Sequence, residues 1–457
     1  MTGGIPEREH VEALVAWALD RLIAVDGIAG ADAMYFSSAS HELSLRDGEL
    51  EENGSGISGG IGVRCIASDG RQGVAWSNSL SRDAVSDLIE WSGKNCLAAE
   101  PEDGIALYDG VLETDDTALR QYDEEIGRGI SPAYRMEACR EMTAAAQRRD
   151  ARVVSVRAAS FHDGVGRSFY AATTGAAGWK VATSASCGVA VVLQEGEACE
   201  MGGYGKSARS LGALDAPSYA RLAVDRAAAV LGGTPLPTGK YTLLLDPEIS
   251  ASLMDEIGEL FCASDIHKGR SMMAGKIGET VAGSVVTLID DGRVPGMTAS
   301  SLFDGEGVPT GRTPLIRDGV ACAYLYNLQY AAKDGVRSTG NASRGLGGLP
   351  DVGTSNLLLL PGSRSRDSLL RDVANGFFVM ELMGLHTLNP VSGDFSLGAK
   401  GVAVRGGELA GPVTAVTIAG NLLDFLKRIS AVGADVETFG STAAPSVVVE
   451  DVTVAGN

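Results

Sequence analysis

Hydrophobic positions recur along this chain with two different periods, which separate predicted helices from predicted strands. An opening amphipathic helix is indicated by apolar residues at helical spacing, namely Val11, Leu14, Val15, Ala18 and Leu22. Short strand-like runs come next, at Ala33–Ser38, Glu42–Leu45 and Gly60–Ala67. Turn signals separate these runs at Arg46-Asp47-Gly48, Glu52-Asn53-Gly54 and Asp69-Gly70. A second helix with Ser81 as its N-cap follows, so this part of the chain is predicted to be a helix, a strand meander and a helix.

The next stretch, about residues 97–130, is acidic and irregular, which predicts a linker or a surface excursion. Ser131-Pro132 then begins a helix that we expect to run to about Arg149, because proline is favoured in the first turn. Further strands and one helix are predicted at Arg152–Ser160, Arg167–Thr174, Ala182–Leu193 and Ser218–Leu231. The Gly/Pro-rich segment Gly233–Gly239 predicts a boundary between an N-terminal α/β domain (residues 1–232) and a second domain (residues 233–457).

Beyond this boundary the pattern becomes that of a β-rich domain. The predicted strands are apolar runs at Tyr241–Leu245, Ser284–Ile289, Ser355–Leu360 and Val413–Ile418. Helices are few, and they are predicted at Pro247–Phe261, Arg366–Ala374 and Asn421–Ile429. The sequence therefore predicts an α+β fold, in which an N-terminal α/β domain precedes a β-rich C-terminal domain of barrel or stacked-sheet type.

Charge and cysteine content limit the partners and the compartment. The formal net charge is −20, which disfavours direct binding to nucleic acid, because phosphate contacts rely on Lys and Arg. Seven cysteines are scattered without a CxxC pair, which is typical of reduced thiols in a cytoplasmic protein. No long apolar run predicts a membrane span, and no basic segment followed by an apolar run predicts a signal peptide. We expect a cytoplasmic protein that binds neither nucleic acid nor membrane.

No short motif provides a convincing catalytic site by itself. The five histidines are too far apart in sequence to form a short-spaced pair of metal ligands. Asp255 and Glu259 are four residues apart on a predicted helix, where they could hold a hard cation, but a solvated helix face is the better default. Gly56-Ile-Ser-Gly-Gly60 matches the G-x-S-x-G nucleophile pattern, yet its flanks predict neither the required strand before it nor the helix after it.

Several longer strings carry more information than these motifs. They are Lys268-Gly-Arg-Ser-Met-Met-Ala-Gly-Lys-Ile-Gly-Glu279, Asp290-Asp-Gly292, Phe303-Asp-Gly-Glu-Gly-Val-Pro-Thr310, Ser338-Thr-Gly-Asn-Ala342 with Arg344, Asn389-Pro-Val-Ser-Gly-Asp-Phe-Ser396, Ile418-Ala-Gly-Asn421, Arg46-Asp-Gly-Glu-Leu-Glu51 and Gly60-Ile-Gly-Val-Arg64. In order and spacing they resemble the TldD/PmbA family, whose PmbA members were once named modulators of DNA gyrase. The resemblance extends over nearly the whole chain.

The resemblance also implies that a metal site is degenerate. In the family's catalytic subunits, of TldD type, a helix before the Lys-Gly string carries His-Glu-x-x-x-His, and a late cysteine completes a zinc site. Met254, Asp255 and Glu259 stand at the His, Glu and His positions of this motif. Phe439 stands near the late ligand position, and no cysteine follows Cys322. Without imidazole and thiolate the site does not suit zinc, so the chain resembles the PmbA (TldE) type, which lacks the zinc motif.

The resemblance implies a role in peptide hydrolysis that depends on a second subunit. Subunits of this type pair with a TldD-type homologue that supplies zinc, and the pair encloses a cavity where unfolded or small peptides are cleaved. We expect a heterodimer formed through the C-terminal half, or a homodimer through the same surface when the partner is absent. We expect no catalytic residue and no cofactor in this chain. Candidates for a substrate cleft or interface are polar residues of the matching strings: Lys268, Asp304, Glu306, Asn341, Arg344, Asn389, Asp394 and Ser396.

Three other functions stay open from the sequence. The chain could be a dedicated peptidase subunit in a natural-product pathway, which neighbouring genes would decide. It could be a gyrase-binding regulator, as the older family name suggests, which a pull-down would test. It could also be a self-sufficient enzyme that uses Asp255 and Glu259 on another metal, which elemental analysis would test.

Overall fold

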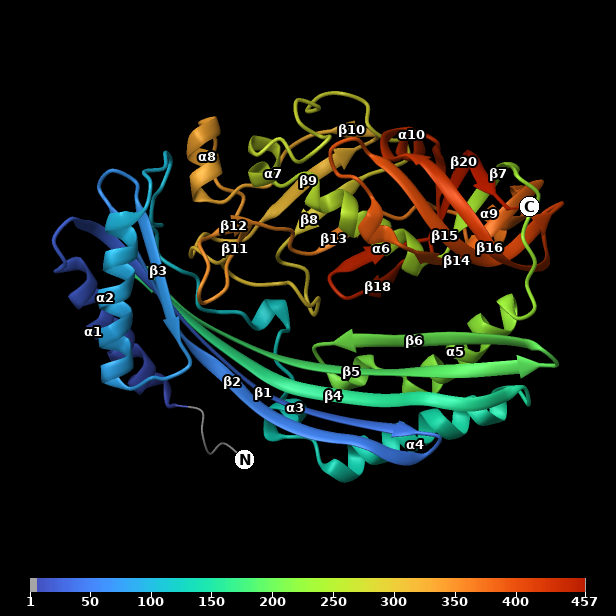
Figure 1. Cartoon of the computed structure of the whole chain (residues 1–457), viewed down its shortest axis with the longest axis horizontal. Helices are drawn as coiled ribbons and strands as arrows, with labels where there is room; N and C mark the ends of the chain where they lie inside the picture. The colour runs from blue at the N-terminus through green and yellow to red at the C-terminus, as the bar shows by residue number, and fades with distance from the viewer. Residues whose placement is uncertain (1–5, 457) are drawn as a thin grey trace.

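The computed structural model describes residues 6–456 as a long curved sheet with a β-rich unit lying along it (Figure 1). The sheet has six antiparallel strands in the order β3-β2-β1-β4-β5-β6. Its strands are β1 (Ile28–Arg46), β2 (Glu49–Ala67), β3 (Gln72–Ser77), β4 (Val153–Ala172), β5 (Ala177–Glu195) and β6 (Ala198–Ala208). Four of these strands are 19 or 20 residues long. The predicted meander is therefore correct in kind, but its strands are much longer than the local pattern indicated.

Two sequence expectations about these strands are wrong. The turn expected at Glu52-Asn53-Gly54 does not form, because these residues stay paired with Glu42, Leu43 and Ser44 of β1. Likewise, the separate strands expected at Arg152–Ser160 and Arg167–Thr174 are parts of the single strand β4. Pairing with neighbouring strands overrides the local turn signals in both cases. The turn at Asp47 and Gly48 does form, with φ values of 50° and 87°.

Four helices cover the sheet in two pairs. Helices α1 (Arg8–Ile23) and α2 (Arg82–Ala98) pack at one end, and α4 (Pro132–Arg149) and α5 (Ala216–Val230) pack at the other. The Ser81 hydroxyl accepts a hydrogen bond from the Ala84 amide at 3.2 Å, as predicted for the N-cap of α2. Between Ala31 and Leu45, the residues that β1 contributes to the cores under both pairs are odd-numbered, since side chains alternate between the two faces of a strand. Even-numbered residues such as Asp32 therefore face away from these helices.

The acidic segment predicted as irregular, about residues 97–130, contains only the short helices η1 (Thr117–Leu119) and α3 (Glu124–Arg128). It runs along the outer edge of β5. The Thr183 amide of β5 donates to the Gln121 carbonyl at 2.9 Å, and the Asp123 amide donates to the Thr183 hydroxyl at 2.9 Å. The segment thus covers part of a strand edge that would otherwise be unpaired.

The second half of the chain contains a small closed barrel, formed by β16-β15-β14-β7-β20. Pairing of Thr417 with Ala455 and of Ile418 with Val454 closes it. Strand β17 (Ile429–Val432) extends β20. The barrel strands are β7 (Gly239–Leu245), β14 (Asn375–Met383), β15 (Asp394–Arg405), β16 (Glu408–Asn421) and β20 (Val447–Ala455). The predicted β-rich C-terminal unit is confirmed as a barrel beside a second sheet.

The second sheet has the order β10-β9-β8-β13-β19-β18, and helix α6 (Pro247–Glu259) packs between it and the barrel. Its strands are β8 (Leu288–Asp291), β9 (Arg312–Arg317), β10 (Val320–Ala321), β13 (Leu357–Leu359), β18 (Glu437–Phe439) and β19 (Thr442–Ala444). The remaining elements of this unit are α7 (Ala263–His267), α8 (Leu328–Asp334), β11 (Ala342–Ser343), β12 (Asp351–Val352), α9 (Arg366–Asp372), η3 (Leu385–Thr387) and α10 (Leu422–Lys427). The strand expected from Ser284 begins only at Leu288, because the Val286 amide instead closes a turn onto the Gly283 carbonyl. Helix α8 was not predicted.

The segment Gly233–Gly239 connects the two halves. Within residues 6–456, an isolated β-bridge in this segment joins Thr234 to Val413, and no sheet extends across it. Elsewhere the halves meet through Tyr170 and Ala172 of β4, which pack against Leu302 and Phe303. None of the helices within residues 6–456 is long and apolar enough to cross a membrane.

Candidate functional site

Helix α6 carries three of the four positions where the resemblance places metal ligands. The Asp246 side chain caps the helix by accepting a hydrogen bond from the Glu248 amide at 3.2 Å. The apolar side chains of α6 then pack between the barrel and the second sheet. This packing fixes the orientation of Met254, Asp255 and Glu259, so their surroundings can be compared directly with those of a metal site.

Each of these three side chains already has a partner within the protein. Met254 is 2% exposed and belongs to the hydrophobic core. Asp255 accepts a hydrogen bond from the Thr442 hydroxyl, and burial raises the pKa of its carboxyl group. Glu259 accepts a hydrogen bond from the Thr354 hydroxyl at 2.9 Å.

The fourth position, Phe439 on β18, meets strand β6 of the long sheet. Its ring centre lies 6.2 Å from that of Tyr204, with an angle of 83° between the rings. The Lys206 ammonium nitrogen lies 4.4 Å from the centre of the Phe439 ring. Lys206 and Tyr204 both donate to Glu437 Oε2 at 2.8 Å. An aromatic ring, a cation and its carboxylate partner therefore occupy this place.

The donors gathered around α6 do not fit a zinc ion. Structural and catalytic zinc sites use imidazole, thiolate and carboxylate groups, whereas this surface offers a buried thioether and two hydrogen-bonded carboxylates. The nearby thiol of Cys262 lies 3.6 Å from Glu259 Oε2, and burial raises its pKa, which favours the neutral form. Within residues 6–456, no group of three or more His, Cys, Asp or Glu side chains could hold a metal ion.

A second cluster is a buried ion network that joins the two halves. Asp32 of β1 accepts hydrogen bonds from Arg64 of β2, at 3.0 Å from Nε and 2.5 Å from Nη2. It also accepts one from Arg344 Nη1 at 2.5 Å, and Arg344 belongs to the C-terminal half. Glu306 of the C-terminal half lies 3.4 Å from Arg64 Nη1. All four side chains are 3% exposed or less, so the network is shielded from water.

The acidic members of this region have shifted pKa values. Burial raises the pKa of Asp32, but the adjacent Arg344 and Arg64 outweigh it and hold the pKa below its usual value. Burial raises the pKa of Glu306 to about 7 and that of Asp304 to about 6. A carboxyl group that titrates near neutral pH in a cleft would suggest acid–base catalysis, but here both groups are enclosed by protein.

Asp304 organises the loops that carry the C-terminal part of the network. Its Oδ1 accepts hydrogen bonds from the amides of Glu306 at 2.8 Å and Val308 at 2.9 Å, and its Oδ2 accepts one from Ala342 at 2.9 Å. Asn341, in the same region, donates to Asp290 Oδ1 at 2.9 Å. The structure thus brings four of the sequence candidates together, as buried loop-holding groups: Asp304, Glu306, Asn341 and Arg344.

The other sequence candidates lie elsewhere on the C-terminal half. Lys268 forms a partly exposed ion pair with Asp351 at 3.2 Å. Asn389 accepts hydrogen bonds from the two amides that follow Pro390, which closes a surface turn. Asp394 accepts one from the Asn421 side chain at 3.2 Å, and Ser396 is exposed on β15. These residues do not form one group with the ion network or with the positions on α6.

Asp32 is a member of the network that sequence reasoning did not single out. Its signal is a charged residue between Ala31 and Ala33, inside a strand where most odd-numbered positions are apolar. A charge in such a strand indicates a buried side chain with an opposite charge beside it. The partner Arg64 did fall within a string that matched the family, but its role could not be read from that string.

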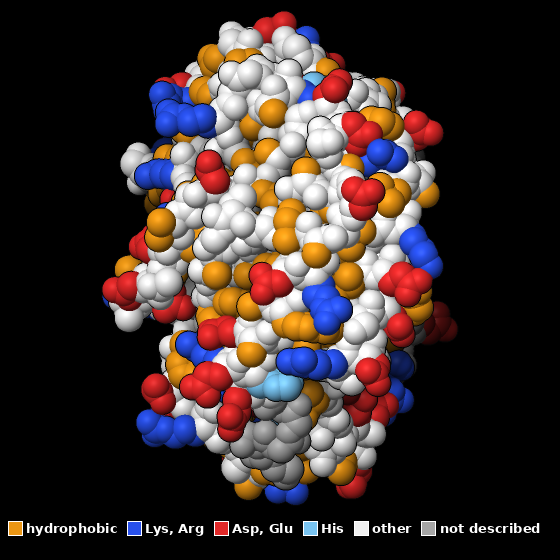
Figure 2. All heavy atoms as spheres, turned by 90° about the vertical axis from the view of Figure 1, so that its left-hand side faces the viewer, with side chains coloured by type: hydrophobic (Ala, Val, Ile, Leu, Met, Phe, Trp, Pro, Cys, Tyr) orange, Lys and Arg blue, Asp and Glu red, His pale blue; other side chains and the backbone are white. Residues whose placement is uncertain are grey.

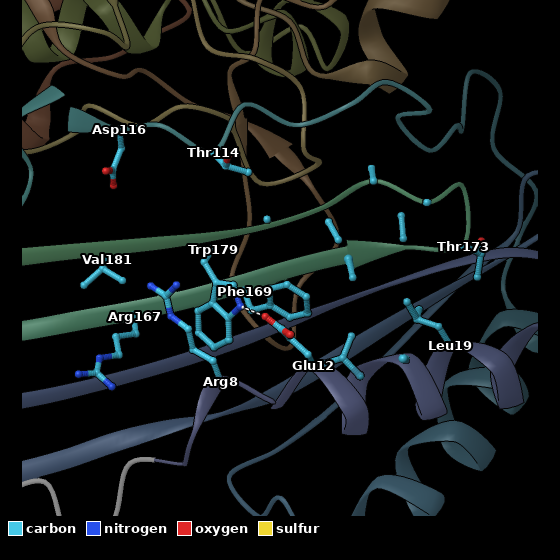
Figure 3. Close-up of a pocket in the computed structure, with 18 of the residues that line it drawn as sticks. Arg8, Glu12, Leu19, Thr114, Asp116, Arg167, Phe169, Thr173, Trp179 and Val181 are labelled. Carbon is cyan, nitrogen blue, oxygen red and sulfur yellow. Dashed lines mark hydrogen bonds between the residues drawn. The ribbon is translucent and has the colours of Figure 1, made fainter. Parts of the chain in front are cut away.

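A hollow of about 1480 Å³ lies between α1, the irregular segment 114–122 and the β4–β5 hairpin (Figure 3). The ring of Trp179 stacks on Phe169 with centroids 4.9 Å apart, and its indole nitrogen donates to Glu12 at 2.6 Å. The Arg8 guanidinium lies 5.2 Å from the centre of the Trp179 ring. In Figure 3, the Arg167 side chain lies next to that of Arg8. Three basic residues (Arg8, Arg120 and Arg167) and three acidic ones (Glu12, Asp20 and Asp116) line the hollow, so its charge does not select an anionic or a cationic ligand.

The end of the molecule that carries α1 and α2 faces the viewer in Figure 2. Hydrophobic side chains run down the middle of this face, and basic side chains are interspersed with acidic ones. On the part of this face that is described, the mixture of charges does not favour a phosphate backbone.

Comparison with known proteins assigns the chain to a family. Models of PmbA/TldA metallopeptidase domains match it in three parts: domain 1 over residues 31–96, the central domain over residues 94–231 and the C-terminal domain over residues 238–456. A metalloprotease from Methanothermobacter thermautotrophicus is 28% identical over 90% of this chain and 89% of its own length. Metalloprotease PmbA of Escherichia coli O157:H7 is 25% identical over 98% of this chain and 97% of its own length.

Solved structures agree with this assignment. A Thermotoga maritima protein named as a modulator of a DNA gyrase is 27% identical, with a TM-score of 0.87 over 98% of this chain and 99% of its own. TldE from Thermococcus kodakarensis, at 22% identity, shares the fold with a TM-score of 0.86 over 98% of this chain and 100% of its own. Matches to all three domain models and to full-length relatives show that this chain belongs to the PmbA/TldD family.

Proposed function

We propose that this chain is the zinc-free subunit of a two-subunit peptidase of the TldD/TldE type. The observation that carries the proposal is the set of groups at the four ligand positions on α6 and β18. A buried thioether, two hydrogen-bonded carboxylates and a phenyl ring occupy them, and this combination is not a zinc site. Because several relatives of the chain are named metalloproteases, the missing ligands point to a homologous partner that holds the metal.

In the proposed complex this chain contributes shape rather than reacting groups. Zinc in the partner would supply the activated water that attacks the peptide bond. The ion network around Asp32 would fix the long sheet to the C-terminal half, so that the two halves present a rigid surface to an unfolded or small peptide. Lys206 and Glu437 are hydrogen-bonded to each other, so we assign neither of them a role in proton transfer.

The test is co-expression with a homologue that carries His-Glu-x-x-x-His, followed by size-exclusion chromatography, elemental analysis and a peptidase assay on an unfolded protein. We expect co-elution, about one zinc ion per pair, and activity that depends on both subunits and is lost on chelation. Separate elution at micromolar concentration, with all the activity in the homologue, would contradict the proposal. So would stoichiometric zinc with chelator-sensitive activity in this chain alone.

A gyrase-binding regulator is a second candidate, because the Thermotoga maritima relative is named for gyrase modulation. The acidic chain would then bind gyrase by protein contacts rather than through DNA. A pull-down with purified gyrase separates the two functions. Capture of gyrase at low micromolar concentration, without co-elution with the peptidase homologue, would favour the regulator.

A further inference from the structure

The outer edge of strand β5 is covered over only part of its length. Strand β6 pairs with it over Ala185–Glu195, and beyond that point the Thr183 amide donates to the Gln121 carbonyl at 2.9 Å. The Thr183 carbonyl, on the same side, accepts a hydrogen bond from Arg209 at 2.9 Å. Both backbone groups of Thr183 therefore point away from β4. The same holds for the residues two, four and six positions earlier, because this direction alternates along an antiparallel strand.

These earlier residues are Val181, Trp179 and Ala177, and we call Ala177–Val181 the free edge of β5. The ladder between β4 and β5 has no register shift in this stretch, so the alternation is undisturbed. Among residues 6–456, no strand or loop forms a backbone hydrogen bond with the outward side of the free edge. A row of N–H and C=O groups, about 17 Å long at roughly 3.4 Å per residue, is therefore left without a partner from the described chain.

The free edge forms one wall of the hollow between α1 and the segment 114–122. Trp179 and Val181 line the hollow on this side, and Thr114 and Asp116 line it on the side of the segment (Figure 3). At about 1480 Å³, the hollow is larger than most sites for small molecules, which measure about 300–1,000 Å³. Neighbouring strands of a sheet lie only about 4.8 Å apart, so a further strand beside the free edge would lie within the hollow.

The wall opposite the free edge is held in place by the C-terminal half. Arg293 forms an ion pair with Glu113 at 2.8 Å, and the Gly296 amide donates to the Leu119 carbonyl at 2.8 Å. These two contacts hold the segment on either side of residues 114–118. The segment therefore stands off from the free edge instead of pairing with it, and the hollow between them is part of the fold.

Gln121 gives an independent sign that a hydrogen-bond donor is missing from the hollow. The residue is 5% exposed and lines the hollow. Its Nε2 group donates to the Leu119 and Met297 carbonyls at 3.0 and 3.1 Å, which fixes the orientation of the side-chain amide. Its Oε1 atom has no partner among the described residues, although buried acceptors are nearly always hydrogen-bonded. A ligand with backbone N–H groups would supply such a donor.

We propose that an extended segment of an unfolded polypeptide binds in this hollow by adding a strand to the free edge of β5. Its backbone would pair with the outward N–H and C=O groups of the edge, as in other cases of strand addition. Every second side chain would point toward α1, where Phe169, Trp179 and Leu19 offer an apolar surface. Basic and acidic residues balance in the hollow, so we expect recognition through the backbone with little dependence on the charge of the peptide.

This binding step goes beyond the proposed function. None of the described residues that line the hollow belongs to α6 or β18, which carry the degenerate ligand positions. Strand addition needs neither a metal ion nor a second subunit. The proposal can therefore fail while the proposed function stands, and the reverse.

The test uses the full chain and a short capped peptide of alternating threonine and leucine. Calorimetric titration should show a dissociation constant in the micromolar range or weaker, because the contact is smaller than a standard interface. The same peptide with every internal amide N-methylated keeps its side chains but cannot donate backbone hydrogen bonds, so it should bind at least about tenfold more weakly. Hydrogen exchange followed by mass spectrometry should show that the unmethylated peptide slows exchange at Trp179 and Val181.

A pair of variants at one position separates the backbone from the side chain. Val181→Pro removes an outward N–H group and places a ring on the free edge, so it should weaken peptide binding at least about tenfold. Proline is tolerated on edge strands where the N–H group has no ladder partner, and an unchanged circular dichroism spectrum checks the fold. Val181→Ala keeps the N–H group and shortens only the side chain. It is the matched control and should bind within about threefold of the parent.

Several results would overturn the proposal. They are no binding at about 1 mM peptide, equal binding of the N-methylated peptide, and protection from exchange that lies outside the free edge. The methylated peptide and the exchange experiment use the parent chain, so they decide the matter even if Val181→Pro does not fold. Protection of the free edge that rises with the concentration of the chain alone, without peptide, would assign the edge to a second copy and would also overturn the proposal.

Discussion

Asp32→Asn is the substitution whose effect follows most directly from the structure. Asp32 receives three charge-assisted hydrogen bonds, two from Arg64 and one from Arg344, and all three side chains are 2% exposed or less. The side-chain amide of the asparagine carries no negative charge. It presents either an N–H group or a neutral oxygen to the two guanidinium groups. Arg64 keeps Glu306 at 3.4 Å, but Arg344 keeps only the Gly348 carbonyl at 3.3 Å. Breaking a buried pair in this way costs about 3–5 kcal/mol.

The assay is urea unfolding followed by tryptophan fluorescence. All four tryptophans lie in the N-terminal half, so fluorescence reports the half that contains Asp32. Glu51→Gln is the control, because Glu51 pairs with Arg46 at a site where both side chains are well exposed, and such pairs contribute less than about 1 kcal/mol. Adding Arg344→Leu to Asp32→Asn removes the stranded cation, so the double variant should be no less stable than the single one. A loss of less than about 1 kcal/mol for Asp32→Asn would refute the reasoning.

The remaining predictions concern pH, one loop and the degenerate metal site. Burial raises the pKa of Glu306 to about 7, so its contribution to stability is complete below its ordinary pKa of 4.5 and is lost as the pH rises through about 7. The free energy of unfolding of the parent, relative to that of Glu306→Gln, should therefore fall as the pH rises from about 5 to 7, by at most about 1.4 kcal/mol per pH unit. Urea titrations of both proteins at each pH measure this difference, and a difference that is independent of pH would contradict the prediction. Gly307→Ala should destabilise the protein by at least about 1 kcal/mol in the same titrations, because Gly307 has φ of 83° and a Cβ there would lie 2.7 Å from the Tyr170 ring; an unchanged urea midpoint would contradict it. Glu259→Gln in the reconstituted complex should leave kcat within about twofold, and a hundredfold loss with intact assembly would mean that this residue has a chemical role.

The elements that could be predicted from sequence are those whose signals are local. Ser131 and Pro132 predicted the start of α4, and the Ser131 hydroxyl accepts a hydrogen bond from the Tyr134 amide at 3.2 Å. The helix α6 was predicted by apolar residues at helical spacing and begins at Pro247 as expected. Caps and periodic faces involve residues a few positions apart, so they can be read without knowledge of the fold.

Strand length could not be predicted, because it is set by partners far away in sequence. Residues 52–54 contain Asn-Gly, a strong turn signal, yet β1 holds them in an extended ladder. The candidate site divides in the same way. The ligand positions on α6 followed from a resemblance along the chain, but the network that joins Asp32 to Arg344 spans 312 residues and has no local signature.

The contacts of Phe439 bear on whether the chain merely lacks zinc ligands. Replacing a ligand by an inert side chain would leave an empty place, which a metal could still approach. Here the Lys206 ammonium lies 4.4 Å from the ring that stands at the fourth position, and its carboxylate partner Glu437 is shared with Tyr204. The charge of Lys206 is offset by Glu437, whose Oε2 lies 2.8 Å from the ammonium nitrogen, so both groups are already engaged with each other. The fourth position is therefore filled by a packed ring and an ion pair rather than left empty, which supports the proposal that this chain is a zinc-free subunit.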